Sequence, residues 1–93
     1  MKKIARRDRL KIYGDLLELL YAESREENIV LTHIQVQLKV PFDRLKTYIS
    51  ELDDLGLIQD QTSLKLTEKG KQYIVEYEKV LDFMKRMGIA YRS

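Results

Sequence analysis

The sequence predicts a small, mainly α-helical protein that carries one two-stranded β-ribbon. Apolar residues recur at helical spacing in several segments, the single proline and a glycine bound one of these segments, and alternating leucines follow it. At 93 residues, the chain is long enough for one modest core and too short for a cleft between two domains. A single compact unit is therefore expected.

The first predicted helix covers about residues 6–24. Its apolar residues spread over more than half of the helix circumference, which is wider than a surface helix of a small domain needs. We therefore expect one side of this helix to pack on the core and the other side to pack on the last helix or on a second subunit. Gly14 lies on the narrow polar side, where it lowers helix stability and has no evident packing role.

Two further helices are predicted around the proline. Thr32 is expected to cap a short second helix. This helix should end before Pro41, because the ring of a proline disfavours helical geometry in the residue before it. A third helix over about residues 41–55 follows, with Pro41 in its first turn and Gly56 after its end. It is strongly amphipathic, and its apolar face consists of Phe42, Leu45, Tyr48, Ile49, Leu52 and Leu55.

A hairpin and a long helix complete the predicted fold. "LIQDQTSLKL" at residues 57–66 has two short apolar stretches around a polar turn, which predicts a tight two-stranded ribbon. Thr67 is expected to cap a final helix that runs to about Met87 and ends at Gly88. This helix either folds back on its own domain or pairs with a second copy. Pairing is favoured because a helix of this length would overhang so small a core.

The order helix, helix, turn, helix, ribbon, helix is the layout of a winged helix-turn-helix. In that layout, two helices hold a third so that its polar face can enter the DNA major groove. Residues 1–67 would form the winged helix-turn-helix DNA-binding domain with a basic N-terminal arm, and residues 68–93 a C-terminal dimerisation helix and tail.

The stretch "IQVQLKVPFDRLKTYISELDDLGLI" resembles winged-helix transcription regulators, and a narrower resemblance extends over nearly the whole chain. "LTHIQ", "DRLKTYISEL", "GLI" and "LTEKGKQYIVEYEKV", after a basic opening, look like archaeal winged-helix DNA-binding proteins of the 10a chromatin-protein type. Members of that group bind duplex DNA as dimers joined by an antiparallel coiled coil of their C-terminal helices. The resemblance implies an archaeal source and a homodimer whose coiled-coil seam consists of Ile74, Tyr77, Leu81 and Met84.

Positive charge is concentrated at the start of the chain. Residues 1–11 carry a net charge of +5, whereas the rest of the chain carries −3. Because the ribbon tip "QDQTS" has no cation, we expect the N-terminal arm to supply the phosphate contacts that the wing lacks. A solvated, frayed terminus is the alternative reading. The arm residues expected to contact DNA are Lys2, Lys3, Arg6, Arg7 and Arg9.

The outward face of the third helix is the predicted base-reading surface. Arg44 and Lys46 would reach phosphate or guanine, and Thr47 and Ser50 would act as short donors and acceptors. The acidic end of the same helix would repel phosphate, which favours a rival reading as a protein-interaction module. That acidic end consists of Glu51, Asp53 and Asp54.

Composition bears on the other classes of function. The chain has no cysteine and one histidine, which excludes thiolate zinc sites and leaves a metal site without partners, so no metal or cofactor is expected. No nucleophile and base stand at recognisable spacing and no glycine-rich phosphate loop appears, so an enzyme is not expected. No run of residues is long enough to span a membrane.

These observations favour a cytoplasmic, nucleoid-associated transcription regulator that reads double-stranded DNA as a homodimer. The alternatives are an architectural chromatin protein with little sequence preference and a winged-helix protein-interaction module.

Overall fold

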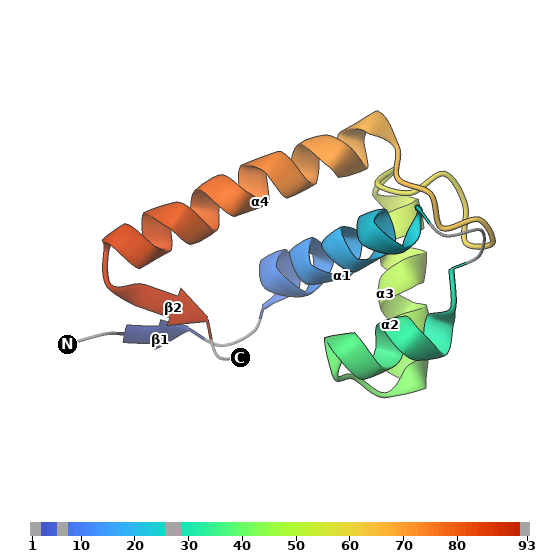
Figure 1. The fold of residues 1–93 in the computed structure, drawn as a ribbon, viewed down its shortest axis with the longest axis horizontal. Helices are drawn as coiled ribbons and strands as arrows, with labels where there is room; N and C mark the ends of the chain where they lie inside the picture. Colours follow the sequence, from blue (N-terminus) through green and yellow to red (C-terminus); the bar gives the residue numbers. More distant parts are fainter. Residues whose placement is uncertain (1–2, 6–7, 26–28, 92–93) are drawn as a thin grey trace.

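The computed structural model describes residues 3–5, 8–25 and 29–91 of the chain. The elements of this part are, in chain order, β1 (Lys3–Ala5), α1 (Arg9–Glu23), α2 (Leu31–Leu38), α3 (Phe42–Asp54), α4 (Glu68–Arg86) and β2 (Ile89–Tyr91). Helix α4 runs alongside α1, while α3 stands at a steep angle to both, with α2 packed beside it (Figure 1). The fold is thus mainly helical, as the sequence predicts.

Helix α1 lies at the centre of the molecule, with α4 on one side and α2 on the other. It begins at Arg9 because the Asp8 carboxylate accepts a hydrogen bond of 3.0 Å from the Lys11 amide and so caps the first turn. The wide apolar arc therefore serves two neighbours, as expected, and the contacts with α4 lie within one chain. The core that α1 shares with the other helices includes Leu16, Leu17, Leu20, Ile34, Leu38, Leu45, Ile49 and Leu52.

The contact between α1 and α4 is built on Gly14. The ring of Tyr77 lies directly against this glycine, and a Cβ atom at position 14 would stand 2.6 Å from Tyr77 Cγ. Tyr77 is only 1 % exposed, and its hydroxyl donates to the Asp15 carboxylate over 3.0 Å. The expectation that Gly14 has no packing role is therefore wrong, because the absent side chain lets the two helices approach.

Helix α2 begins two residues earlier than the predicted cap implies. Its N-cap is Val30, which has no capping side chain, and Thr32 lies inside the first turn, so the predicted Thr32 cap is wrong. The helix ends at Lys39, whose φ of 60° turns the chain sharply towards Pro41. Pro41 is itself the N-cap of α3, which agrees with the predicted helix to within one residue at each end.

The wing segment of the structure pairs over a shorter stretch than the predicted two-stranded ribbon. Only Ile58 and Leu66 pair across it, as one antiparallel bridge. The Asp60 carboxylate accepts hydrogen bonds from the amides of Thr62 and Ser63, over 2.8 and 2.6 Å, and these bonds close the turn. Four apolar side chains of the segment are buried, so burial rather than strand pairing holds it in place; they are Leu57, Ile58, Leu64 and Leu66.

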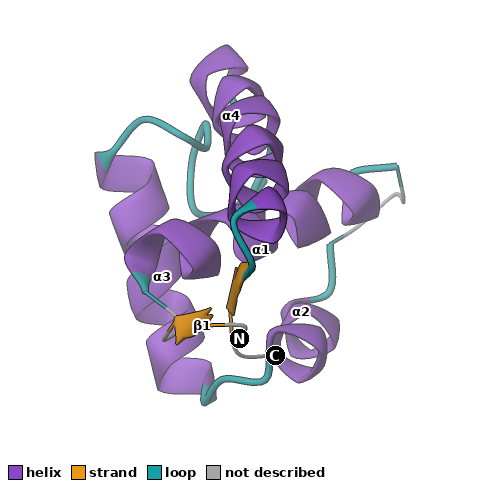
Figure 2. Ribbon diagram, turned by 90° about the vertical axis from the view of Figure 1, so that its left-hand side faces the viewer, coloured by secondary structure: helices purple, strands orange, loops and turns teal. Residues whose placement is uncertain are grey.

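The sheet of the described residues joins the two ends of the chain. Helix α4 starts at the predicted cap, where the Thr67 hydroxyl accepts from the Gly70 amide, and it ends just before Gly88, whose φ is 75°. Strand β2 then pairs in parallel with β1, with Lys3 opposite Ile89 and Ala5 opposite Tyr91. The strand pair lies beyond the N-terminal end of α1 (Figures 1 and 2). A basic N-terminal arm and a C-terminal tail were predicted here, and their pairing was not predicted.

Candidate nucleic-acid interface

Helix α3 has one fully buried side and one side that faces solvent. Leu45 and Leu52 are 0 % exposed and hold the helix on the core. The opposite side is polar, and three of the four predicted base-reading residues on it are exposed, whereas Ser50 is half-buried. A helix of this diameter fits the major groove of B-form DNA. The exposed residues are Arg44, Lys46 and Thr47.

The exposed side chains of α3 make few interactions with the rest of the protein. The Lys46 ammonium lies 5.9 Å from the centre of the Phe42 ring, one turn earlier in the helix. The Thr47 hydroxyl donates to the Asp43 carbonyl over 3.1 Å, which leaves its oxygen able to accept a further hydrogen bond. Asp43 stands in the first turn, where a carboxylate stabilises the helix dipole.

Arg9 connects the start of α1 to the flank of α3. Its guanidinium lies 4.9 Å from the centre of the Tyr48 ring, and its Nε lies 3.2 Å from Glu51 Oε1. This residue was predicted to contact DNA as part of a basic N-terminal arm, and the structure holds its exposed side chain against α3. Of the other arm residues, Lys3 belongs to β1, whereas Lys2, Arg6 and Arg7 lie outside the described residues.

The acidic end of α3 is largely engaged within the protein. Glu51 accepts a hydrogen bond of 2.6 Å from the Tyr13 hydroxyl in addition to its ion pair with Arg9. Asp53 accepts a hydrogen bond of 3.1 Å from the Gln61 side chain of the wing segment. Phosphate repulsion by this end is therefore weaker than the sequence suggests, because the Glu51 charge is compensated.

The helices around this surface match a known architecture along most of the chain. A family model described as winged helix-turn-helix matches residues 6–85. The chain belongs to the winged helix-turn-helix family. The comparison with curated proteins gives no match, and the comparison with solved structures gives none either.

In this winged helix-turn-helix, the predicted dimer seam lies partly against its own chain. Tyr77 is covered by α1, and Ile74 packs against the core. Leu81 and Met84 are half-buried. Both line a hollow of about 280 Å³ together with the three residues of β2. The most exposed apolar side chains at this end of α4 are Phe83, at 52 %, and the C-cap residue Met87, at 56 %.

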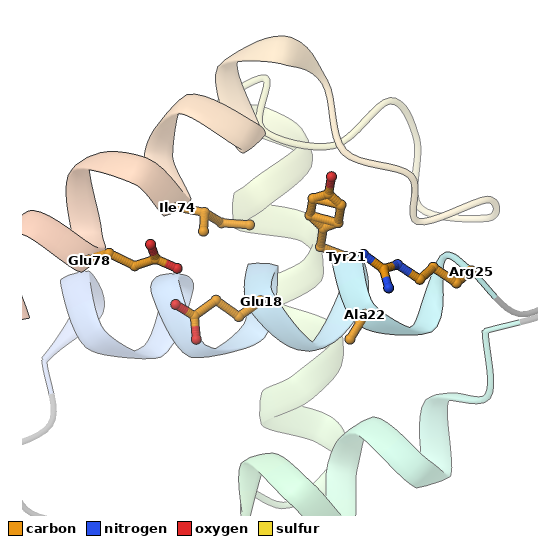
Figure 3. Close-up of a pocket in the computed structure, with 6 residues that line it drawn as sticks. All are labelled: Glu18, Tyr21, Ala22, Arg25, Ile74 and Glu78. Atoms are coloured by element: carbon orange, nitrogen blue, oxygen red, sulfur yellow. The ribbon is translucent and has the colours of Figure 1, made fainter.

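A groove of about 560 Å³ separates α1 from α4 on another face of the winged helix-turn-helix. Its lining residues include Glu18 and Glu78, whose carboxylates point towards one another across the two helices (Figure 3). Partial burial raises the pKa of Glu18, and the charges of Glu78 and Asp15 raise it further. This pair of carboxylates was not predicted from the sequence. The feature that could have indicated a groove between α1 and α4 is the wide apolar arc of α1.

The described residues contain neither a cluster of metal-ligating side chains nor a membrane-spanning helix. In residues 3–5, 8–25 and 29–91, no three histidine, cysteine or acidic side chains are grouped so that they could hold a metal ion. In the same part of the chain, no helix combines the length and the apolar character needed to cross a bilayer.

Proposed function

We propose that this winged helix-turn-helix protein reads double-stranded DNA by inserting α3 into the major groove and that it regulates transcription in the cytoplasm, at the nucleoid. The supporting observation is the two-sided character of α3: its apolar face is buried, and its opposite face presents Arg44, Lys46 and Thr47 to solvent. In the proposed complex, Arg44 and Lys46 contact phosphate or guanine. Thr47 and Ser50 read base edges at close range, because their side chains are short.

Electrostatics favours a regulator over a protein that coats DNA. Indiscriminate coating depends on neutralising many phosphates. Here residues 1–11 carry a net charge of +5, and the rest of the chain carries a net charge of −3. A single basic region attracts and orients DNA, while the exposed face of α3 supplies the contacts that distinguish sequences.

A homodimer is part of the proposal. Phe83 on α4 and Met87, which caps the C-terminal end of α4, are large apolar side chains that are more than half exposed. Together with Leu81 and Met84, they give the C-terminal half of α4 an apolar flank that a second α4 would cover. This geometry accords with the resemblance to the archaeal 10a type, and it would present two α3 helices to two half-sites on DNA.

Binding to a labelled mixed-sequence duplex, followed by fluorescence anisotropy, tests the proposal. Wild-type affinity should fall as salt rises, because bound cations displace counterions from the DNA. Changing Arg44 and Lys46 together to alanine should weaken binding about tenfold or more, at roughly 1–3 kcal/mol for each good base contact. The matched control changes Lys79 and Arg86 of α4 to alanine, which removes the same charges away from α3.

Selection from a randomised duplex pool separates regulation from architecture. A regulator should enrich one site and bind it about a thousandfold or more tighter than bulk DNA. Equal affinity for all duplexes, with normal salt dependence, would instead support the architectural role.

A protein-interaction module is the second candidate, and one observation favours it. Val36 is 72 % exposed and Phe42 is 39 % exposed, on either side of the turn between α2 and α3. Exposed apolar side chains near one another are common at partner sites. Absence of duplex binding even at low salt would favour this candidate over DNA recognition.

A further inference from the structure

The start of α1 and the flank of α3 share a connected group of polar side chains. The Tyr13 hydroxyl donates a hydrogen bond of 2.6 Å to Glu51 Oε1, and the Arg9 Nε lies 3.2 Å from the same oxygen. The Arg9 guanidinium also lies 4.9 Å from the centre of the Tyr48 ring. Two residues of α1 and two of α3 thus form one group, which we call the Arg9 network; its members are Arg9, Tyr13, Tyr48 and Glu51.

The other members of the network restrict where the Arg9 guanidinium can lie. Tyr48 is 4 % exposed, so its ring is a fixed surface for the cation. Burial and the Glu51 carboxylate raise the pKa of Tyr13, so its hydroxyl remains protonated and donates to Glu51 at neutral pH. Because Glu51 is itself held by Tyr13, it pairs with Arg9 from one orientation.

Arg9 keeps hydrogen-bonding capacity beyond this network. Its ion pair with Glu51 uses Nε, and the side chain is 56 % exposed. The terminal nitrogens of a guanidinium carry further N–H donors, in a planar fork that matches the oxygens of a phosphate. Arg9 can therefore stay paired with Glu51 while it binds a phosphate group.

The network lies next to the proposed base-reading residues of α3. Tyr48 stands four residues after Arg44, and Glu51 stands four residues after Thr47. Side chains four residues apart are neighbours on one face of a helix, so Arg9 lies about one turn along α3 from Arg44 and Thr47. The major groove is bounded by the two phosphate backbones, and a residue on the flank of an inserted helix faces one of them.

We propose that Arg9, held by Tyr48 and Glu51, is a preset phosphate clamp through which the start of α1 fixes the register of α3 in the major groove. The proposal rests on the DNA-binding function argued above. Phosphate contacts set the orientation of a protein on the duplex, and holding a long side chain in place beforehand lowers the entropic cost of binding. Tyr13 is a positioning residue, because it acts through Glu51 and does not itself touch DNA.

Variants of Arg9 separate geometry from charge, with the labelled duplex and fluorescence anisotropy as the measurement. Arg9→Ala should weaken binding about tenfold and reduce the slope of log K against log salt concentration by about 0.9, the value for one phosphate contact. Arg9→Lys keeps the charge and lacks the planar fork, so it should show most of the same loss. Binding of Arg9→Lys equal to that of wild type would overturn the proposal.

Lys11→Ala is the matched control for the lost charge. Lys11 lies two residues after Arg9 on α1 and pairs with Asp15 over 2.9 Å. Its removal should leave both the affinity and the salt slope close to those of wild type. A reduction as large as that of Arg9→Ala would show that net charge at this end of α1 is the cause, which would overturn the clamp.

Combining Tyr13→Phe with Arg9→Ala tests the positioning role. Tyr13→Phe alone should weaken binding, whereas in the Arg9→Ala background it should have no further effect. An equal loss in both backgrounds, or no loss in either, would overturn the role. Tyr77→Phe removes another hydrogen bond from a tyrosine to a carboxylate, at 3.0 Å from Asp15, and should leave the affinity unchanged; an equal loss there would point to general destabilisation.

Nuclear magnetic resonance reports directly on the position of the Arg9 side chain. The Nε–H signal of Arg9 is identified by its absence in Arg9→Lys, and its exchange with water should accelerate in Tyr13→Phe. An unchanged exchange rate would contradict the positioning role of Tyr13. Urea unfolding of each variant verifies that the compared proteins are folded.

These measurements separate failure of the further inference from failure of the proposed function. If wild-type protein does not bind the labelled duplex at low salt, the DNA-binding function is wrong and the clamp is rejected with it. If wild type binds and Arg9→Ala keeps the full affinity and salt slope, only the clamp is wrong.

Discussion

Gly14 and Tyr77 show how one missing side chain can set the distance between two helices. Glycine lowers the stability of an isolated helix, and on α1 it stands on the polar side. In the folded protein, the Tyr77 ring occupies the space that a Cβ atom would fill, and its hydroxyl reaches Asp15. Burial and the nearby Asp15 carboxylate raise the pKa of Tyr77, so its hydroxyl remains a donor at neutral pH.

Gly14→Ala should therefore destabilise the protein although alanine favours helices. The added methyl group must displace the Tyr77 ring, and overpacking of this kind costs about 1–3 kcal/mol, which exceeds the helix-propensity gain of about 1 kcal/mol. Urea unfolding measures the change in the free energy of unfolding. In a Tyr77→Leu background, the same Gly14→Ala change should be neutral or stabilising. A loss of equal size in both backgrounds would contradict the steric explanation.

Glu18 gives a prediction with a defined pH dependence. Its pKa is raised from the ordinary value of 4.5 by burial and by the charges of Glu78 and Asp15, so the folded protein holds the Glu18 proton more tightly than the unfolded chain does. The ionised carboxylate is then unfavourable above the raised pKa, and this penalty disappears below about 4.5.

Glu18→Gln should consequently raise the free energy of unfolding at pH 7 by a few tenths of a kcal/mol, the usual scale for neighbouring like charges on helices. The advantage over wild type should shrink as the pH falls through the raised pKa and vanish near pH 4. Thermal unfolding across this pH range measures it. Glu76→Gln, which removes an ion-pair partner of Lys79, should give no gain at pH 7; a gain there would point to net charge as the cause.

At the scale of elements, the turn between α2 and α3 fixes the direction in which α3 leaves the end of α2. Lys39 closes α2 in the left-handed region, at φ 60°, and Pro41 then starts α3 in an extended conformation. A residue with a Cβ atom is strained at such a φ. The turn keeps its direction because Leu38 and Leu45, on its two sides, are buried in the same core.

Lys39→Gly should stabilise the protein by roughly 0.5–1 kcal/mol, because the steric cost of a positive φ that glycine avoids exceeds the additional backbone entropy that glycine loses on folding. Lys39→Ala removes the same charge and keeps the strain, so it should give no such gain. The midpoint of urea unfolding compares the two variants. Equal stability of the glycine and alanine variants would show that the charge, and not the backbone, matters at this position.

The elements that the sequence predicts well are those with a strong local pattern. Helices α3 and α4 agree with the prediction to within about one residue, because apolar spacing, the Thr67 cap and the glycines define them locally. The parallel pairing of β1 and β2 has no such pattern, since "KIA" and "IAY" are short and distant in sequence. The wing is intermediate, with a well-marked turn and only a single bridge.

At the scale of the whole molecule, helical periodicity shows that a face is covered and does not show which partner covers it. Ile74 and Tyr77 were predicted to meet a second subunit, and the structure packs them against their own chain. Arg9, which was predicted to contact DNA from the basic N-terminal arm, has an exposed side chain that lies against Tyr48 and Glu51 of α3. The exposure of Arg44, Lys46 and Thr47 followed from the pattern because α3 has one strongly apolar face.

The proposed homodimer leads to a prediction about molecular mass. Light scattering after size exclusion should give twice the chain mass of 11.1 kDa for the wild type. Phe83→Glu should give the mass of a single chain, because it places a charge in the proposed apolar contact. Val75→Glu, at another exposed apolar residue of α4, is the matched control and should remain dimeric. A wild-type protein that is monomeric at about 100 μM would exclude a stable dimer of the proposed kind.

The joining of β1 to β2 also affects the order in which the protein forms during synthesis. The helices close over short stretches of sequence, so they can pack while the chain is still emerging from the ribosome. Strand β1 is made among the first residues, and its partner is made among the last of the described chain. The nascent protein therefore acquires its helical core before the β1–β2 pair can form, because β2 becomes available only after residue 91 has been released.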